Sequence, residues 1–306
     1  MKPDTAPHSR QRGVALISVL LIFALVVILA SDIASRQYLD TRSTANLLGM
    51  RQAEYYALGA EEWARQMLYR DRAENTRDTL LESWAEEQRF EPENGEMVVV
   101  IRDAQGLFNL NNLVDDNGVV NAAQLAIFQR LLADLKLPQA YAERVVDWLD
   151  RDNRSASGGD EQGHEDHRPA NMRIAHPSEL RAMGMADADY RALRPLICTL
   201  PASTPYNVNT LEGALLKALA GGVGASGMAR IAAKQRAGGY TSLGEFEADL
   251  GRSVPAGLLS LDTRFFQVQV NARFGDYLTL MHSLILRDRT GDQTQMRIVR
   301  REYGIE

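Results

Sequence analysis

The sequence predicts an α+β fold: a long N-terminal helix packed on a small antiparallel sheet, with a large all-α domain inserted after the first strand. Three observations carry this prediction. An apolar run near the N-terminus continues into a long stretch with helical spacing. Short β-branched segments stand on either side of the middle of the chain, and the middle itself, residues 110–258, shows helical patterns only. A sheet whose strands are separated in this way has been split by an insertion.

Residues 14–30 form an apolar segment with one weakly polar side chain, Ser18, and no charge. At about 1.5 Å per residue, such a helix covers about 25 Å, at the short end of what spans a bilayer. Because Lys2, Arg10 and Arg12 precede the segment, the positive-inside rule predicts a cytoplasmic N-terminus. The sequence therefore predicts a single-pass membrane protein whose body lies outside the cytoplasm.

Three interpretations of this N-terminal region are open on the residues alone. The first is a secretory signal cleaved near Ala30 and Ser31, and the second is an uncleaved signal anchor. The third starts from Gly13, which stands between the last basic residue and the first apolar one. A cut on the cytoplasmic side of the apolar segment would leave that segment on the mature protein.

Size and charge narrow the class of protein. The 306 residues permit two domains, and a net charge of −6 with a pI near 5.5 argues against broad nucleic-acid binding. Cys198 is the single cysteine, which excludes an intramolecular disulfide. We expect Cys198 to be buried and inert, with an intermolecular bridge as the alternative.

Residues 31–89 contain no proline, and apolar or small side chains recur there at intervals of three or four. This spacing predicts that the membrane segment continues as one long helix. One predicted face consists of Tyr38, Thr41, Ala45, Leu48, Gln52, Tyr55 and Gly59. The side chains expected to pack on the sheet are Tyr55, Tyr56, Leu58, Trp63, Met67 and Leu68.

The remaining elements follow from breakers and periodicity. Pro92, Asn94 and Gly95 end the helical region, and the β-branched residues 96–103 predict the first strand. Helical spacing covers residues 122–135, 141–149, 178–183 and 186–193. Strand-like segments return at 262–272, 276–286 and 295–303, with Gly275 and Gly291 at the turns.

Residues 207–250 resemble a helix-hairpin-helix unit, a module often used to hold DNA phosphates. Asn209 and Thr210 are expected to cap a helix over 211–219, and a second helix covers 227–236. The four basic side chains, Lys217, Arg230, Lys234 and Arg236, are matched by four acidic ones, Glu212, Glu245, Glu247 and Asp249. Without a basic surface, helical packing is favoured over DNA binding, and a DNA-uptake role is the disfavoured alternative.

Residues 147–166 form an acidic loop with seven carboxylates in twenty residues. Calcium is bound in proteins by six to eight oxygen ligands on a flexible backbone, and this loop offers such oxygens. The spacing of an EF-hand is absent, however. The residues alone therefore leave two interpretations open, a calcium site and a solvated acidic loop. His164 and His167 are three residues apart, whereas zinc proteases space two histidines by four on a helix. The two neighbouring histidines make a membrane-anchored, metal-dependent hydrolase the rival class of function, and their spacing disfavours it.

The run Gln11, Arg12, Gly13 before Val14 resembles the leader of type IV pilins and type II secretion pseudopilins. The resemblance implies that prepilin peptidase cleaves between Gly13 and Val14 and that Val14 becomes N-methylated. It also implies an inner-membrane protein with a periplasmic body. Residues 1–13 would then be the leader.

Ser18 occupies mature position five, where most of these proteins have Glu. In those families the Glu is thought to pair with the N-terminal amine of a neighbouring subunit in the growing fibre. A subunit without this Glu suits the fibre tip, the position that has no subunit above it. With Ser18, the insertion and the acidic pattern together, the chain resembles the minor pseudopilin K (GspK) family of type II secretion.

This second resemblance implies a scaffold rather than an enzyme, needed for fibre initiation and protein export across the outer membrane. It implies calcium held by Asp147, Asp150, Asp152, Glu165 and Asp166. The implied partners are minor pseudopilins of the I and J type, and also exoprotein cargo or the outer-membrane channel. The expected partition is leader 1–13, membrane helix 14–30, helix and first strand 31–109, inserted domain 110–258 and final strands 259–306.

Overall fold

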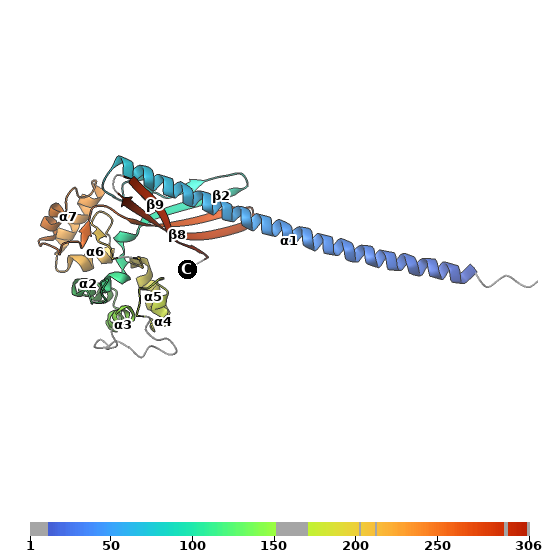
Figure 1. Cartoon of the computed structure of the whole chain (residues 1–306), viewed down its shortest axis with the longest axis horizontal. Helices are drawn as coiled ribbons and strands as arrows, with labels where there is room; N and C mark the ends of the chain where they lie inside the picture. The colour runs from blue at the N-terminus through green and yellow to red at the C-terminus, as the bar shows by residue number, and fades with distance from the viewer. Residues whose placement is uncertain (1–11, 151–170, 202, 212, 291–292, 305–306) are drawn as a thin grey trace, which may run out of the picture.

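The computed structural model describes residues 12–150, 171–201, 203–211, 213–290 and 293–304. Its longest element is the helix α1 (Arg12–Glu74), whose 63 residues extend about 95 Å. The N-terminal half of α1 projects away from the body, and its C-terminal half lies along the sheet (Figure 1). The long N-terminal helix predicted from the sequence is therefore confirmed.

The prediction that helical structure reaches Arg89 is wrong, because α1 ends at Glu74. The side chain of Asn75 accepts a hydrogen bond from the backbone N–H of Arg77 (3.1 Å), which gives the backbone a local alternative to the helix. The Arg77 side chain then donates to the carbonyl of Tyr240 (3.0 Å) in the inserted domain. The chain leaves the helix here and turns towards the sheet.

One antiparallel sheet of five strands lies against α1, in the order β1-β2-β7-β8-β9. The strands are β1 (Gln88–Phe90), β2 (Gly95–Asp103), β7 (Phe265–Phe274), β8 (Tyr277–Thr290) and β9 (Gln293–Tyr303). The four predicted strands are confirmed, and the three-residue β1 was missed. Gly275 adopts φ 54° at the β7–β8 turn, a backbone conformation that favours glycine. Residues 104–264 separate β2 from β7 in sequence, although the two strands are hydrogen-bonded neighbours.

Small side chains let α1 approach the sheet closely. They repeat every three or four residues on the face that meets the sheet: Gly49, Ala53, Ala57, Ala60 and Ala64. They meet the buried side chains of β2, β7 and β8: Val99, Ile101, Phe266, Val268, Val270, Met281 and Ile285. Leu68 and Trp84 close this core at the end near the inserted domain.

The predicted packing face of α1 was partly wrong. Leu68 is buried and Tyr56, Leu58, Trp63 and Met67 pack partly buried against the sheet, as expected. Tyr55, however, is 65% exposed, and the predicted stripe from Tyr38 to Gly59 faces solvent. The buried stripe consists of alanines, whose small size gives a weaker apolar signal than the exposed tyrosines and leucines.

The inserted domain is built from helices around one core of its own. The α-helices are α2 (Ala122–Asp134), α3 (Ala140–Leu149), α4 (Glu179–Ala182), α5 (Asp187–Leu193), α6 (Gly213–Ala220), α7 (Ala225–Arg236) and α8 (Leu243–Leu250). The 3-10 turns are η1 (Ser83–Ala85), which precedes the domain, and η2 (Ala104–Gly106), η3 (Leu110–Leu113) and η4 (Arg194–Leu196). Two short parallel pairs join distant segments: β3 (Phe108–Asn109) with β4 (Ile197–Cys198), and β5 (Tyr206–Asn207) with β6 (Leu259–Ser260). Two-residue strands are too short for periodicity to predict.

The helix caps match the sequence in part. Asn121 caps α2, and the Ser242 hydroxyl accepts from the N–H of Glu245 (3.3 Å) at the start of α8. The predicted cap at Asn209 is wrong, because its side-chain oxygen accepts instead from the N–H of Tyr240 (2.6 Å). This bond ties the start of the 207–250 unit to the turn between α7 and α8.

Candidate functional site

The N-terminal part of α1 is an exposed apolar surface. The side chains of Val14, Leu16 and Ile17 are between 63% and 68% exposed, and none of the most apolar 18-residue window of the helix is buried. A core helix of a soluble domain would bury such a surface, whereas a bilayer would solvate it. The segment is therefore suited to a membrane, in agreement with the predicted anchor.

Ser18 satisfies its hydroxyl within the same helix. Its Oγ donates to the carbonyl oxygen of Val14, four residues earlier, at 2.9 Å. A polar group in hydrocarbon needs such an internal partner, because no water is available there. Ser18 therefore sits in the apolar segment without a charge and without needing a neighbouring chain.

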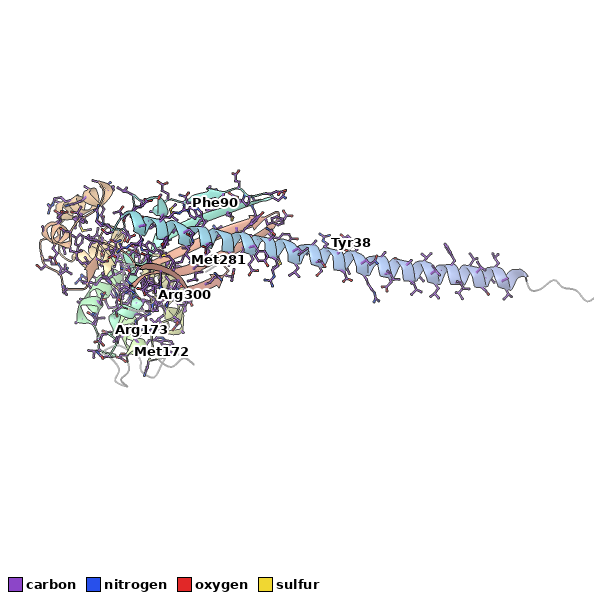
Figure 2. All side chains as sticks on the ribbon, turned by 45° about the horizontal axis from the view of Figure 1, so that its top comes forward. Tyr38, Phe90, Met172, Arg173, Met281 and Arg300 are labelled. Carbon is purple, nitrogen blue, oxygen red and sulfur yellow. The ribbon has the colours of Figure 1, made fainter. Side chains whose placement is uncertain are left out.

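A second apolar surface of α1 lies beyond the membrane segment. Tyr38 lies on the projecting part of the helix (Figure 2), and its side chain is 61% exposed. The other large exposed side chains between 33 and 55 are Ile33, Leu39, Leu47, Leu48, Met50 and Tyr55. Apolar side chains concentrated on the outside of one helix are typical of a surface that packs against another protein.

A buried ion cluster joins the end of α1 to the sheet. Arg287 on β8 forms ion pairs with Asp71 (2.9 Å) and Asp78 (2.5 Å), and its guanidinium also lies over the ring of Phe266. Asp78 further accepts from the backbone N–H of Thr263 (2.6 Å). Burial raises the pKa of Asp78 to about 7, although Arg287 acts in the opposite direction.

Asp103, the last residue of β2, joins the same cluster to the inserted domain. Its carboxylate accepts from Thr210 Oγ1 (2.6 Å), Asn207 Nδ2 (3.0 Å) and the hydroxyl of Thr263. The same Asn207 amide donates to the carbonyl of Asp78 (3.0 Å). The network therefore fixes the inserted domain to the sheet. No local sequence signal marks it, since Arg287 and Asp78 are 209 positions apart.

Two of the five predicted calcium ligands lie at the end of α3. Asp147 and Asp150 are 1% and 6% exposed, and the N–H of Asp150 closes the helix by donating to Val146. Trp148 between them donates to Glu179 (3.3 Å). Carboxylates buried at the negative end of a helix dipole favour a bound cation, so this donor chemistry fits calcium. Asp152, Glu165, Asp166, His164 and His167 lie outside the described residues.

A separate acidic group occurs near the junction. Within the described residues, ligand atoms of Asp71, Asp78 and Glu82 lie within 4.8 Å of one another. Arg287 already supplies the positive charge there, since it pairs with two of the three carboxylates. We therefore interpret this group as a structural ion cluster and not as a metal centre.

The helix-hairpin-helix-like unit of residues 207–250 packs into the inserted domain and has no basic surface formed by the four basic side chains named above. Its ion pairs are Lys217 with Asp134 (2.6 Å), Arg230 with Asp249 (3.3 Å) and Lys234 with Glu245 (2.6 Å). Ile231 and Phe246 from this unit are buried in the core of the inserted domain. Three of the four basic side chains singled out in the sequence are thus neutralised locally, which leaves little charge for phosphates.

Cys198 is buried, as expected, and its Sγ donates to the carbonyl of Ala104 (3.2 Å). Burial raises the pKa of the thiol well above its ordinary value. This environment makes the thiol a poor nucleophile.

The chain is similar to known proteins of one family. Two family models, both described as type II secretion system protein K, match residues 106–202 and 206–262. Protein K of Pseudomonas aeruginosa is 36% identical over 96% of this chain and 93% of the relative. Protein K of Pectobacterium carotovorum is 33% identical over 97% and 98%. Among solved structures, a chain of the GspK-GspI-GspJ complex from enterotoxigenic Escherichia coli is similar, with a TM-score of 0.72 and 26% identity, over 87% of this chain and 99% of that chain.

Proposed function

The chain belongs to the protein K family of the type II secretion system, and on this premise we propose that it is the tip subunit of the pseudopilus. It is a minor pseudopilin, and its role is to initiate the fibre that serves protein export across the outer membrane. It works as a scaffold and not as an enzyme.

Ser18 carries the proposal of the tip position. A subunit that joins the fibre below another one needs a carboxylate that pairs with a neighbour's N-terminal amine, as the resemblance implies. Ser18 offers no charge, and its hydroxyl is already bonded to Val14. A carboxylate in a lipid-facing helix is tolerated only when it is paired. A subunit with no neighbour to pair with therefore avoids the cost of an unpaired carboxylate by having Ser18 at this position.

Replacing Ser18 tests the tip position. The Ser18→Glu variant introduces a carboxylate that costs about 3 kcal/mol in the apolar segment unless it is paired. We expect it to alter the incorporation of the chain or the length of the fibre, measured by cross-linking and electron microscopy. Ser18→Ala, the matched control, lacks both charge and hydroxyl and should assemble normally. Unchanged assembly and secretion in Ser18→Glu would argue against the tip position.

Maturation follows from the same premise. Prepilin peptidase cleaves between Gly13 and Val14, and the new N-terminus at Val14 is methylated. The apolar segment remains as the inner-membrane anchor, with the leader on the cytoplasmic side and the body in the periplasm. The exposed apolar surface of residues 14–29 supports this arrangement.

The partners are other minor pseudopilins, of the I and J type. The similar solved structure is described as a complex of GspK with GspI and GspJ. On this chain, the exposed apolar side chains of α1 between residues 33 and 55 offer the surface on which neighbouring stems would pack. Such packing would bury side chains, such as Leu48 and Tyr55, that face solvent in the isolated chain.

The inserted domain faces away from the membrane. It lies at the end of the molecule opposite the start of α1 (Figure 1), so in a fibre rooted in the inner membrane it would point outward. There it would meet the outer-membrane channel or exoprotein cargo. Its bulk beyond the sheet also leaves little room for a further subunit above it.

Calcium would stabilise the inserted domain. Asp147, Asp150, Asp152, Glu165 and Asp166 would hold the ion, which supplies positive charge and crosslinks α3 to the acidic loop. The burial of Asp147 and Asp150 at the end of α3 supports this proposal. The domain would then be rigid where it projects from the fibre.

A further inference from the structure

Carboxyl groups outnumber cations at the junction between α1, the sheet and the inserted domain. Ligand atoms of Asp71, Asp78 and Glu82 lie within 4.8 Å of one another, and Asp103 is buried in the same network of hydrogen bonds. Among the described residues, Arg287 is the one cation that forms ion pairs with this carboxyl cluster. With all four carboxyl groups ionised, one guanidinium would leave three negative charges uncompensated away from water. Burial makes such charge costly, so the closed junction favours bound protons.

Two of these carboxyl groups share a hydrogen bond across the turn that follows α1. They belong to Asp71, on α1, and to Glu82, which precedes η1. Two carboxylates have no donor between them, so this bond exists only if one of the two groups carries a proton. Glu82 also accepts from the indole N–H of Trp84 (2.6 Å), which is buried. A proton at this place therefore holds segment 75–85 against the last turns of α1.

Segment 75–85 also carries contacts that hold the inserted domain. The Arg77 side chain donates to the carbonyl of Tyr240 (3.0 Å), and the carbonyl of Asp78 accepts from the side chain of Asn207 (3.0 Å). Both partners belong to the inserted domain. Because the segment lies between the two parts of the molecule, its movement away from α1 would break both bonds.

We propose that this junction is a pH-sensitive clasp, in which protons on Asp78 and on the Asp71–Glu82 pair keep the inserted domain docked on the end of α1, and their release loosens it. A pocket of about 530 Å³ borders Arg287 and Thr263, so water reaches the edge of the cluster. The other charged side chains around this pocket pair with one another: Arg72 with Asp262 (3.5 Å) and Arg264 with Asp288 (3.0 Å). The clasp does not depend on the position of the chain in the fibre.

The clasp closes at low pH and loosens as the pH rises. Burial raises the pKa of Asp78 to about 7, and it also raises the pKa of Glu82 and of Asp103 above their ordinary values. In the loosened junction Asp78 meets water, so its pKa returns towards 3.8. Between these two values the docked form holds a proton that the loosened form has released. For Asp78 alone, the docking equilibrium should be about tenfold weaker at about pH 8 than at about pH 6.

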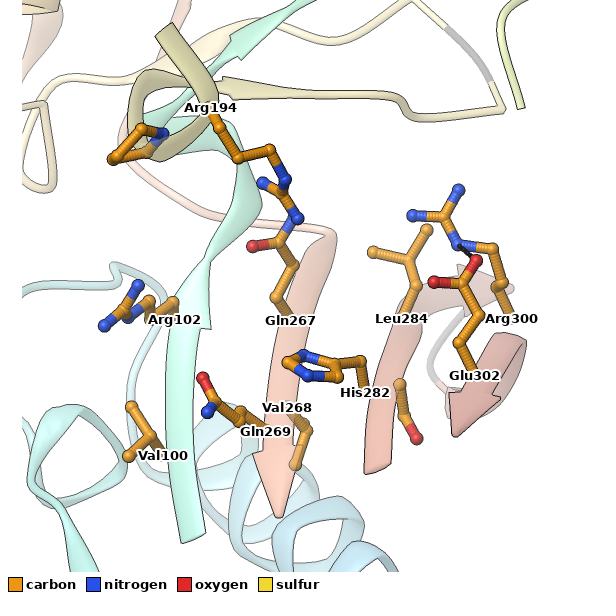
Figure 3. Close-up of a pocket in the computed structure, with 12 residues that line it drawn as sticks. Val100, Arg102, Arg194, Gln267, Val268, Gln269, His282, Leu284, Arg300 and Glu302 are labelled. Atoms are coloured by element: carbon orange, nitrogen blue, oxygen red, sulfur yellow. Dashed lines mark ion pairs between the residues drawn. The ribbon is translucent and has the colours of Figure 1, made fainter. Parts of the chain in front are cut away.

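Histidine is the side chain that most often changes charge near neutral pH, and both histidines of the described residues lie away from the clasp. His282 lines a pocket of about 240 Å³ that no residue of the carboxyl cluster lines (Figure 3). The next residue, Ser283, bonds to Glu61 on α1, so His282 points to the other face of the sheet. His176, in the inserted domain, lies 3.5 Å from Glu302 on β9. Replacing either histidine leaves the clasp unaltered, which provides two controls.

Hydrogen exchange of the full chain in detergent, measured by mass spectrometry at about pH 6 and about pH 8, tests the proposal. After correction for the intrinsic pH dependence of exchange, the protection of residues 75–85 should fall about tenfold at the higher pH. Protection at the far end of β7, in residues 268–274, should stay constant. Asp78→Asn should lose most of this pH effect, because an amide does not titrate. His282→Gln and His176→Gln should keep it.

Glu82→Gln keeps the proposal testable if circular dichroism shows that Asp78→Asn does not fold. It removes one group of the proton-sharing pair and should reduce the change in protection. Equal protection of residues 75–85 at the two pH values would overturn the proposal. A change that persists undiminished in both carboxyl variants, that vanishes in His176→Gln, or that extends equally to residues 268–274 would overturn it as well.

Discussion

Gly49 shows how a single residue sets the distance between α1 and the sheet. A Cβ atom at this position would lie 2.2 Å from the ring of Tyr277. The hydroxyl of Tyr277 in turn donates to the side chain of Asn46 (2.7 Å) on the preceding turn of α1. The glycine thus lets the β7–β8 end of the sheet dock under the helix where the projecting stem begins.

Gly49→Ala should therefore destabilise the body. The new methyl group forces Tyr277 away and disrupts its bond to Asn46, which we expect to cost about 1–3 kcal/mol. Gly59→Ala is the control, because nothing lies within 4 Å of its Cβ position, and the better helix propensity of alanine should stabilise by about 0.5–1 kcal/mol. Urea unfolding of the full chain in detergent measures both. Equal effects at the two positions would contradict the role of Gly49.

Asp78 gives the stability of the body a specific pH dependence. Burial raises its pKa from 3.8 to about 7, so between these values the folded chain holds a proton that the unfolded chain has released. Stability contributed by this group is present at low pH and is lost as the pH rises to about 7, at about 1.4 kcal/mol per pH unit.

Asp78→Asn isolates this contribution, because the amide does not titrate. The free energy of unfolding of the unaltered chain should fall more steeply from about pH 5 to about pH 7 than that of the variant. Urea unfolding at several pH values measures both slopes. The difference between the slopes belongs to Asp78, since the other titrating groups are shared. Parallel slopes would show that the carboxyl is ionised throughout the range.

At the scale of the elements, α1 carries two different surfaces. Periodicity predicts the helix well, but the large apolar side chains, such as Leu48 and Tyr55, point away from the sheet. Pattern analysis assigns the most apolar face to the core, and here that face is left for contacts outside the chain. The true packing face of alanines became clear only in three dimensions.

The end of α3 is the element where a calcium effect should appear. Removing calcium with a chelator should lower the melting temperature, and calcium at about 100 times its Kd should restore about 2.7 kcal/mol. Asp147→Asn and Asp150→Asn should abolish this shift. Asp276→Asn, at an exposed position in the β7–β8 turn, should leave it intact.

Metal analysis of the same samples separates this account from the hydrolase alternative. Calcium bound to the unaltered chain and lost in the Asp147 and Asp150 variants supports a structural ion. Stoichiometric zinc that survives both substitutions would instead support a site at His164 and His167.

At the scale of the whole molecule, the order of elements in the sequence predicted a sheet split by an insertion. Hydrogen bonding between β2 and β7 confirms it, because these neighbours enclose the inserted domain. The junction itself was not predictable. Its central residues, Asp78, Asp103, Asn207 and Arg287, come from four distant segments, and each alone is an ordinary polar residue.

Some features of the candidate site could be predicted from the sequence, and others could not. The apolar segment and Ser18 are local features and are recognised in the sequence. The proposed calcium ligands are also local, but burial, which distinguishes Asp147 and Asp150 from solvated carboxylates, emerges only from the fold.

The mass of the mature N-terminus tests the central claim, that this chain is a processed fibre subunit anchored by residues 14–30. Top-down mass spectrometry of the protein purified from cells with an active prepilin peptidase should find a chain that starts at N-methylated Val14. A chain that starts near Ser31, or one that retains Met1, would contradict it.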